Sequence, residues 1–359
     1  MSLAEDLRRS GRLAITRPDI VYLGYSGRGN VGDDALLEAN RRLIAPAVLS
    51  LAPISGPVLD RLVTGPWPRL ATHTLLIGGG TLIGRPDWRS RIERLRMLMP
   101  EARVLVSGAG VEEPEFSGAR TYASDDELRA WAPLLSSGAG VRGPRSARLL
   151  ARVGVEATVV GDPVLALGPD RPWTRIEDDL IGLNVAWPED VYGGDRSAVV
   201  RQLANGLAAL LERGYRVRIV PMETGDVEVS RALVADLPAR WRERVEVPRL
   251  PRNAAELIEL LAPCSVVVGQ RLHTMIAAHA AFVPALSIAY RPKCFDHLDA
   301  IGRPEWALRS DEITADALVA LVESVRSDRA EQVRHLRTRV GELRQRLHEQ
   351  ARLVNVRPA

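Results

Sequence analysis

Three basic side chains within residues 269–295 (GQRLHTMIAAHAAFVPALSIAYRPKCF) have the types and spacing of a reactive site. Arg271 and His273 follow the apolar run SVVVGQ (265–270), and Lys293, the only lysine in the chain, lies twenty residues after His273. Arginine binds phosphate or carboxylate through paired hydrogen bonds, and histidine exchanges protons near neutral pH. The stretch therefore predicts a site that binds an anion and moves protons.

A glycine-rich turn in the first half, GYSGRGNVGDDALLEAN (24–40), predicts a second candidate site. A helix is expected to begin near Asp33, where its free N–H groups could receive an anion. From Gly27 the glycines fit the dinucleotide spacing G-x-G-x-x-G. The second strand, AVLSLAP (47–53), lacks the acidic ribose ligand, which disfavours NAD. Asn30 belongs to the turn, and Asp33 and Asp34 either cap the helix or face a cleft.

Two shorter motifs also end predicted strands. In IGGGT (77–81), Gly79 and Gly80 allow either close approach of a ligand or a tight turn, and both interpretations stay open. In VRGPRS (141–146), Arg142 directly follows a short strand and is the better anion ligand of the two arginines. Asp162, after a later strand, could orient a neighbouring side chain.

The elements that must position these residues are short apolar runs that alternate with helical segments, which is typical of α/β folds. Asp87 and Ser146 are expected to cap two of the helices. The pattern predicts two tandem Rossmann-like, doubly wound domains with the active cleft between them, at the C-terminal ends of the strands. The predicted strands are 20–26, 47–53, 74–79, 103–110, 138–143, 157–162, 180–187, 215–222, 244–248, 265–270 and 284–290.

A charged, proline-containing segment, GPDRPWTRIEDD (168–179), is the expected linker between domains 1–170 and 178–325. A helix at 328–355 follows, and it carries an apolar stripe at 3–4 spacing. That helix either packs on the body of the chain or forms a dimer seam, so a homo-oligomer stays open. The stripe consists of Val333, Leu336, Val340, Leu343 and Leu347.

Composition limits the classes of partner. The net charge is +3, and the arginines are dispersed, so we expect no nucleic-acid-binding arm. The two cysteines, Cys264 and Cys294, lack metal-site spacing and suit a reducing compartment. We expect no signal peptide, and no apolar run reaches the ~18 residues that span a bilayer. The predicted location is the cytoplasm, with peripheral contact at the inner face of the membrane left open.

The chain resembles the polysaccharide pyruvyl transferase family from about residue 20 to 300. The resemblance implies a GT-B-like fold and transfer of the pyruvyl group of phosphoenolpyruvate to a sugar as a cyclic ketal, with release of phosphate. It demands neither a redox cofactor nor a metal. The motifs that carry it are GNVGDDA (29–35), LLIGGGT (75–81), VSGAGV (106–111), VRGPRS (141–146), GDPVLAL (161–167) and GQRLHTMIAAHAAFVPALSIAYRPK (269–293).

The resemblance also implies roles for residues. Arg271, His273 and Lys293 would form the catalytic site of the C-terminal, donor-side domain, and the N-terminal domain would bind the acceptor. Gly143 stands where the family usually has an acidic or polar residue, which puts the role of Arg142 in doubt. The implied substrate-binding residues are Arg142, Asn30, Asp33, Gly79, Gly80, Gln270 and Tyr290.

The expected partners are phosphoenolpyruvate and a sugar or lipid-linked glycan acceptor from a cell-surface polysaccharide or its precursor. Two other functions stay open. One is a sugar-nucleotide glycosyltransferase of the same architecture, although no acidic ribose ligand is identified. The other is a non-catalytic sugar-binding protein that has kept the fold.

Overall fold

The fold comes from a computed structural model that describes residues 3–16, 18–53, 58, 60, 72–116, 123–186 and 190–355. The chain forms two compact units. Unit 1 consists of Met1–Arg28, Leu36–Pro163 and Gln345–Ala359, and unit 2 consists of Gly29–Ala35 and Val164–Arg344. The predicted linker thus falls inside unit 2. There the Arg344 guanidinium binds the carbonyls of Leu165 and Pro169, at 2.7 and 2.8 Å.

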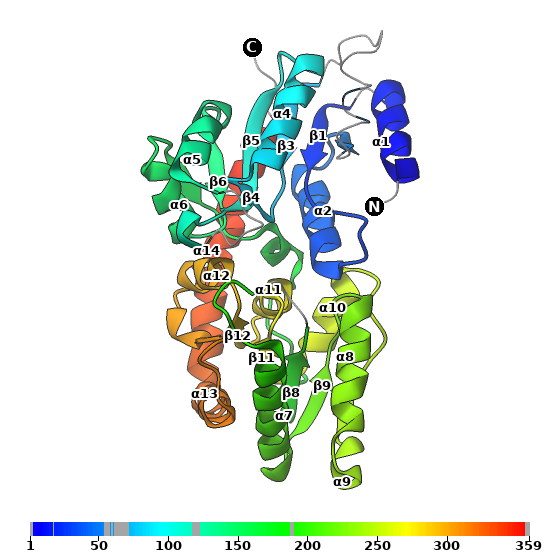
Figure 1. The fold of residues 1–359 in the computed structure, drawn as a ribbon, viewed down its shortest axis with the longest axis vertical. Coiled ribbons are helices and arrows are strands. Elements are labelled where there is room, and N and C mark those ends of the chain that lie inside the picture. Colours follow the sequence, from blue (N-terminus) through cyan, green and yellow to red (C-terminus); the bar gives the residue numbers. More distant parts are fainter. Residues whose placement is uncertain are drawn as a thin grey trace. The chain divides into compact units, whose positions relative to one another are not determined.

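Unit 1 is built on a parallel sheet with the strand order β2-β1-β3-β5-β6-β7, in which β4 also pairs with β5 (Figure 1). Every residue of β1 and β3 is buried, as continuously apolar strands covered on both faces should be. The strands are β1 (Ile20–Leu23), β2 (Leu49–Leu51), β3 (Thr74–Ile77), β4 (Thr81–Ile83), β5 (Arg103–Val111), β6 (Ala139–Val141) and β7 (Ala157–Val159). The helices are α1 (Leu3–Thr16), α2 (Val31–Ile44), α4 (Pro86–Leu98), α5 (Asp125–Trp131) and α6 (Pro144–Ala151).

Unit 2 repeats this plan with a parallel sheet in the order β10-β9-β8-β11-β12-β13. Its central strand β11 is buried along its whole length. The strands are β8 (Glu177–Asn184), β9 (Arg216–Ile219), β10 (Val245–Glu246), β11 (Cys264–Gly269), β12 (Ala285–Ala289) and β13 (Ala307–Arg309). The helices are α7 (Arg196–Glu212), α8 (Thr224–Ala235), α9 (Ala239–Arg242), α10 (Ala254–Leu261), α11 (Leu272–Ala280), α12 (Pro292–Ile301) and α13 (Ala315–Ser327).

Each sheet has one point where the strand order reverses. In unit 1 it lies between β1 and β3, and in unit 2 it lies between β8 and β11. Open α/β sheets bind ligands in the crevice beyond the carboxyl ends of the strands at such a switch point. The predicted doubly wound fold is confirmed, and the topology indicates where each unit could hold a ligand.

The C-terminal helix α14 (Arg329–Asn355) belongs to both units. Leu336, Val340, Leu343 and Leu347 are each 0% exposed, so the chain itself covers most of the apolar stripe. In unit 1, the Gln350 amide donates to the carbonyl of Val106 at 2.8 Å. The buried part of this stripe is therefore not available as a dimer seam.

Two predicted helix caps are wrong. Helix α4 is preceded by Arg85, and Asp87 lies inside its first turn. Helix α6 is preceded by Gly143, and Ser146 lies inside the helix, where its hydroxyl accepts from the N–H of Val111 at 3.0 Å. In both helices a proline occupies the first position and begins the helix earlier, because its fixed φ suits that position.

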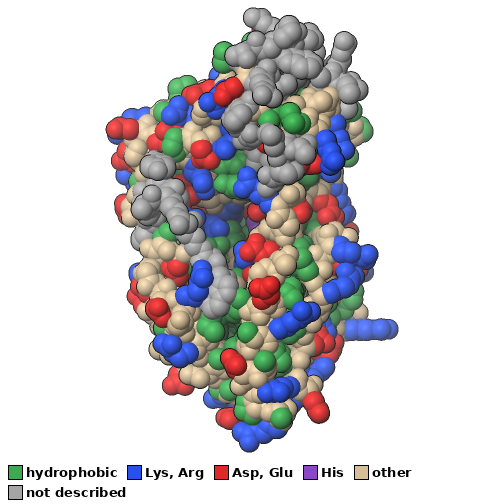
Figure 2. Space-filling view, turned by 45° about the vertical axis from the view of Figure 1, so that its right-hand side comes forward, with side chains coloured by type: hydrophobic (Ala, Val, Ile, Leu, Met, Phe, Trp, Pro, Cys, Tyr) green, Lys and Arg blue, Asp and Glu red, His purple; other side chains and the backbone are tan. Residues whose placement is uncertain are grey.

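Charged side chains do not gather by sign on the visible face. Figure 2 shows Lys and Arg side chains interspersed with Asp and Glu. Among the described residues, no helix combines the length and the apolar character needed to cross a membrane.

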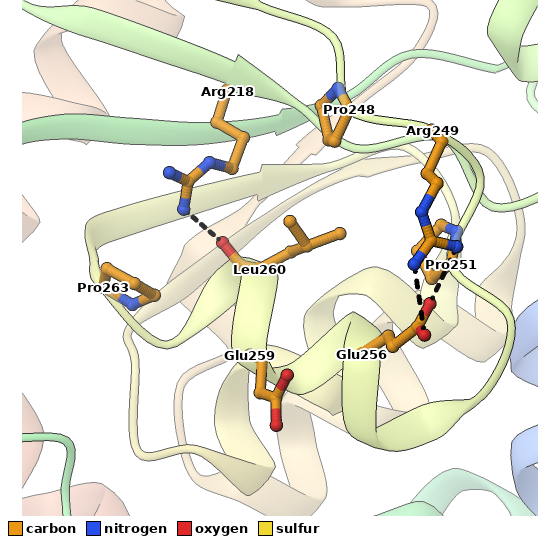
Figure 3. Close-up of a pocket in the computed structure, with 8 residues that line it drawn as sticks. All are labelled: Arg218, Pro248, Arg249, Pro251, Glu256, Glu259, Leu260 and Pro263. Carbon is orange, nitrogen blue, oxygen red and sulfur yellow. Dashed lines mark hydrogen bonds and ion pairs between the residues drawn. The ribbon is translucent and has the colours of Figure 1, made fainter.

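Unit 2 also has a pocket of about 470 Å³ beside α10, which none of the predicted site residues lines (Figure 3). Its lining residues are Arg218, Pro248, Arg249, Pro251, Glu256, Glu259, Leu260 and Pro263.

Candidate functional site

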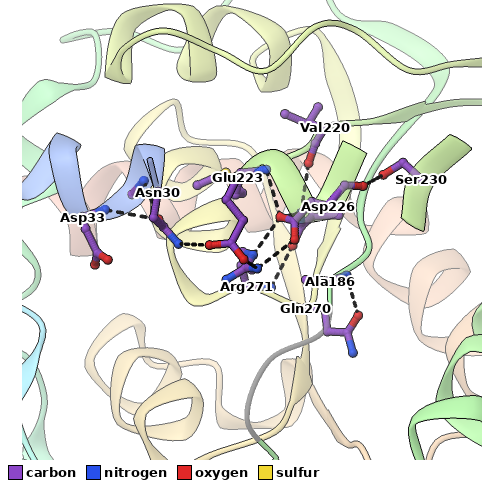
Figure 4. A network of polar contacts seen from close by, with 12 residues as sticks. Asn30, Asp33, Ala186, Val220, Glu223, Asp226, Ser230, Gln270 and Arg271 are labelled. Atoms are coloured by element: carbon purple, nitrogen blue, oxygen red, sulfur yellow. Dashed lines mark hydrogen bonds and ion pairs between the residues drawn. The ribbon is translucent and has the colours of Figure 1, made fainter. Parts of the chain in front are cut away.

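Side-chain amides hold the ends of β8 and β11 together at the switch point of unit 2 (Figure 4). The Gln270 carbonyl oxygen accepts from the N–H of Ala186 at 2.9 Å. The Asn184 carbonyl oxygen accepts from the N–H of Arg271 at 2.8 Å. Both amides are buried, and they bond backbone groups just past the point where the two strands separate. Gln270, predicted to bind substrate, thus holds the backbone beside Arg271.

A buried aspartate fixes the guanidinium of Arg271. Its Nε and Nη2 donate to the two carboxylate oxygens of Asp226 at 2.7 and 2.8 Å. Asp226 is 1% exposed and also accepts from the N–H of Met222 at 3.0 Å. Burial lowers the pKa of Arg271, but the hydrogen bond and charge of Asp226, with Glu223, outweigh burial and raise it. Arg271 therefore stays charged, and Asp226 occupies its Nε–Nη2 fork.

Glu223 joins Arg271 to the start of helix α2. One of its carboxylate oxygens bonds Nη2 of Arg271, and the other accepts from the Asn30 amide at 3.3 Å. The sequence prediction missed both Glu223 and Asp226. The run METGD (222–226) shortly after β9 was the available signal, since it places two carboxylates at a strand end of the same sheet.

Helix α2 begins at Val31, and its cap is Asn30 rather than Asp33. The Asn30 side-chain oxygen accepts from the N–H groups of Gly32 and Asp33, at 3.0 and 3.3 Å. The N–H of Val31 donates to the carbonyl of Met222 at 2.9 Å, and that of Asp34 donates to the carbonyl of Asn30. The expected anion site at this helix N-terminus is wrong, because its N–H groups already have acceptors. Figure 4 shows the Asp33 carboxylate pointing away from the network.

The imidazole of His273 packs against the backbone of Gly32. His273 is the second residue of α11 and is half-buried. A Cβ atom added at Gly32 would lie 2.4 Å from both Cβ and Nδ1 of His273. Real Cβ atoms do not approach so closely, so this contact requires glycine. The glycine-rich turn therefore forms one wall around His273.

Lys293 follows the next strand of the same sheet. Strand β12 pairs with β11 in parallel, with Gly269 beside Ser287, so both strands end at the same edge. Lys293 is the second residue of α12, and its Nζ lies 4.9 Å from the ring centroid of Tyr290. The described residues offer it no ion pair, which leaves the only lysine available to an anion. Tyr290 is itself buried.

Three of the predicted site residues, Gly79, Gly80 and Arg142, lie in unit 1. A Cβ at Gly79 would lie 2.5 Å from Cδ2 of Leu36, so packing alone requires this glycine; Gly80 beside it has a φ of 78°. Arg142 is 1% exposed, and its Nε donates to Asp162 at 3.1 Å. Asp162 therefore orients Arg142; the sequence alone had not identified which side chain Asp162 would orient.

The other predicted residues lie in unit 2. The Asn30 amide bonds Glu223, which in turn bonds Arg271, and the backbone of Gly32 packs against His273. Among the described residues there is no group of three or more His, Cys, Asp or Glu side chains that could hold a metal ion. The predicted residues in unit 2 are Asn30, Asp33, Gln270, Arg271, His273, Tyr290 and Lys293.

A family model of polysaccharide pyruvyl transferases matches residues 30–292, which is more than half of the 359 residues. The chain belongs to the polysaccharide pyruvyl transferase family. Membership of this family supports a transferase role in polysaccharide biosynthesis. The matched range includes Asn30, Arg142, Arg271 and His273, and it ends one residue before Lys293.

This pyruvyl transferase family member also has a curated relative and structural neighbours. The amylovoran biosynthesis protein AmsJ of Erwinia amylovora is 29% identical over 122 residues, which cover 33% of this chain and 29% of that protein. The match therefore spans less than a third of the relative's length.

Solved structures show the fold. The UDP-GlcNAc 2-epimerase of Methanocaldococcus jannaschii, in complex with UDP-GlcNAc and UDP, has a TM-score of 0.55 at 11% identity and covers 85% of this chain and 91% of its own. A putative UDP-N-acetylglucosamine 2-epimerase of Listeria monocytogenes has a TM-score of 0.54 at 11% identity, with 89% and 90% covered. At such identities the likeness shows the fold alone, which is the tandem Rossmann-like, GT-B-like architecture.

Proposed function

We propose that this chain transfers the pyruvyl group of phosphoenolpyruvate to a sugar of a cell-surface polysaccharide or its precursor, as a cyclic ketal, and releases phosphate. The observation that carries the proposal is that Arg271 and His273 follow β11 at the switch point of unit 2, and that Lys293 follows β12, the parallel strand beside β11. Membership of the polysaccharide pyruvyl transferase family supports the reaction class.

The reaction needs a donor and an acceptor of protons. The C3 methylene of phosphoenolpyruvate gains a proton, and one sugar hydroxyl attacks C2 and loses its own. The bond from C2 to the phosphate oxygen then breaks, phosphate leaves, and a second hydroxyl adds to C2 and releases the second proton. The two sugar hydroxyls together lose two protons. One balances the proton gained at C3, and the other leaves with phosphate or water. His273 would exchange these protons, since an imidazole titrates near neutral pH.

Charge decides which groups would bind the donor. Arg271 faces two carboxylates, Asp226 and Glu223, so these three groups together carry one negative charge. Lys293 has no ion pair within the described residues and would be the main attraction for the phosphate or carboxylate of the substrate. Because Nε and Nη2 of Arg271 donate to Asp226, its Nη1 would make a single contact with the substrate. The resemblance also assigns Arg142 of unit 1 to anion binding, where Asp162 would hold it.

Phosphate release provides the test of the reaction. The purified chain is incubated with phosphoenolpyruvate and a panel of glycans that carry vicinal or 1,3-related hydroxyls, and inorganic phosphate and product mass are measured. We expect phosphate release that requires both substrates, with product heavier by a pyruvyl ketal. Sugar transfer from UDP- or GDP-sugars, without any reaction of phosphoenolpyruvate, would instead establish the glycosyltransferase alternative.

The variant Lys293→Arg tests the assignment of the donor site. It keeps the charge but replaces a compact ammonium by a planar fork that fits the same space poorly. We expect KM for phosphoenolpyruvate to rise about tenfold, because substrate binding in both ground and transition states is weakened. Arg213→Lys, an exposed change on the C-cap of α7, is the control and should leave both constants unchanged. An undiminished Lys293→Arg enzyme would remove Lys293 from the site.

A further inference from the structure

Two buried histidines of unit 2 have no part in the chemistry proposed above. His279 on α11 and His297 on α12 are each 0% exposed. Nδ1 of His279 lies 2.9 Å from Nε2 of His297, so one ring donates a hydrogen bond and the other accepts it. The ring planes are 26° apart and the centroids are 5.2 Å apart, and Trp306 lies beside His279. The hydrogen bond directly links the two helices.

Burying a pair of imidazoles in a core costs free energy that apolar side chains would not cost. Each loses hydration that a leucine would not lose, and only a well-made hydrogen bond offsets that loss. Burial also lowers the pKa of His279 to about 3, so His279 is neutral and the hydrogen bond persists at neutral pH. What such a bond adds beyond apolar packing is one fixed relative position of the two helices.

Both linked helices begin at the candidate site. His273 is the second residue of α11, and Lys293 is the second residue of α12. At 1.5 Å per residue, His279 lies ~9 Å along its helix from His273, and His297 lies ~6 Å along its helix from Lys293. Within so short a length a helix is stiff, so the contact between the histidines fixes the first turns of both helices.

Helix α14 anchors the other end of α12. Nε2 of His335 lies 2.8 Å from the carbonyl of Ile301, and Nε of Arg339 donates to the carbonyl of Ala300 at 2.6 Å. These contacts hold the last turn of α12. The histidine pair lies between this anchor and Lys293 and joins α12 to α11.

We propose that the His279–His297 hydrogen bond is a positioning clip that sets the place of Lys293 relative to His273. The inference rests on the proposed function, because only that function gives both groups a role in one reaction. His279 and His297 act through α11 and α12 and are positioning residues, not catalytic ones.

The shape of histidine provides a matched set of variants. An Asn amide reaches the place of Nδ1, and a Gln amide reaches the place of Nε2. His279→Asn and His297→Gln therefore keep the clip, whereas His279→Gln and His297→Asn misplace it. The double variant His279→Leu with His297→Leu removes both partners of this hydrogen bond together, so neither imidazole is left buried without the other. His73→Leu, which removes a hydrogen-bonded histidine from unit 1, is the control.

The first measurement is kinetic. The misplaced and double Leu variants should lower kcat at least about tenfold, since small displacements of reacting groups are that costly. His279→Asn and His297→Gln should restore most of kcat, and His73→Leu should not affect it. KM for phosphoenolpyruvate should change less than kcat, because the clip governs alignment rather than charge.

The second measurement does not need activity. Reductive methylation with ¹³C-formaldehyde labels the chain at its one lysine and its α-amino group. The Lys293 methyl resonance should be shifted by the Tyr290 ring, and it should move in the misplaced and double Leu variants but not in the conservative ones. An unmoved resonance in the double Leu variant overturns the clip, whether or not kcat falls. A wild type that releases no phosphate counts against the proposed function alone, because the resonance still tests the clip.

Discussion

The two switch points have the same topology but different contents. In unit 1, the Tyr22 ring lies over the strand ends of β1 and β3, where a Cβ added at Gly78 would lie 1.8 Å from the ring. The Tyr22 hydroxyl donates to the carbonyl of Gly78 at 2.9 Å. In unit 2, the equivalent crevice holds amides and the Arg271–Asp226 ion pair instead. One crevice is filled by packing and the other is lined by charge, so the fold alone does not create a site.

The largest expected difference between the units is catalytic. His273→Gln in unit 2 should lower kcat by about 10²- to 10⁴-fold, the usual loss when an acid–base group is removed. Tyr22→Phe in unit 1 should leave kcat unchanged and lower the free energy of unfolding by about 1 kcal/mol, through one lost hydrogen bond. Steady-state kinetics and urea unfolding measure both. An equal loss of kcat in Tyr22→Phe would show that unit 1 takes part in the chemistry.

The buried ion pair of unit 1 should instead dominate stability. Asp162→Asn leaves the enclosed Arg142 charge without its carboxylate, and should cost about 3–5 kcal/mol of unfolding free energy. The control is Asp179→Asn, which breaks the partly exposed Arg216–Asp179 pair of unit 2 and should cost less than about 1 kcal/mol. Similar urea midpoints for the two variants would mean that burial does not distinguish these pairs.

A smaller kinetic effect is expected at the wall around His273. Gly32→Ala pushes a methyl group into the imidazole and should lower kcat about 100-fold by displacing it. Gly341→Ala on α14 is the control, since a methyl group there meets no neighbour within 4 Å and should slightly stabilise the helix. Unchanged kcat in Gly32→Ala would show that the contact with His273 has no functional weight.

The smallest expected effect is the response of unit 2 to acid. Burial lowers the pKa of His279 from 6.5 to about 3, so below pH 6.5 the unfolded chain binds a proton that the folded chain does not. Stability from this group is complete above pH 6.5 and falls towards pH 3 by up to about 1.4 kcal/mol per pH unit. Between pH 7 and 5, wild type should lose about 2 kcal/mol more than His279→Asn in urea unfolding. Equal losses would place the acid sensitivity elsewhere.

Local patterns predicted the strands well. Every strand predicted from an apolar run is present, because short apolar runs between turn residues are typical of strands in a sheet. The short strands β4 and β13 were missed, since three residues give too weak a pattern to separate from a loop. Helices α1, α9, α12 and α13 were also missed. The three wrong helix caps, Asp33, Asp87 and Ser146, share one cause: each helix begins two or more residues earlier than the first acidic or hydroxyl residue suggested.

The partners of the site residues were not predictable. Asp226 lies 45 positions before Arg271, and nothing in either local sequence refers to the other. The same holds for Gly32 and His273, and for His279 and His297. Such pairs form only when the order of strands in the sheet brings distant turns to one edge.

The sequence by itself determined the alternation of strands and helices, and hence that Arg271, His273 and Lys293 follow strand ends of one sheet. Those features depend on hydrophobic periodicity and turn residues, which act over a few positions. Only the tertiary structure decided that Asp226 holds Arg271, that Gly32 supports His273, and that Tyr22 fills the matching crevice of unit 1. Those contacts depend on strand order and close packing, which the whole sheet sets.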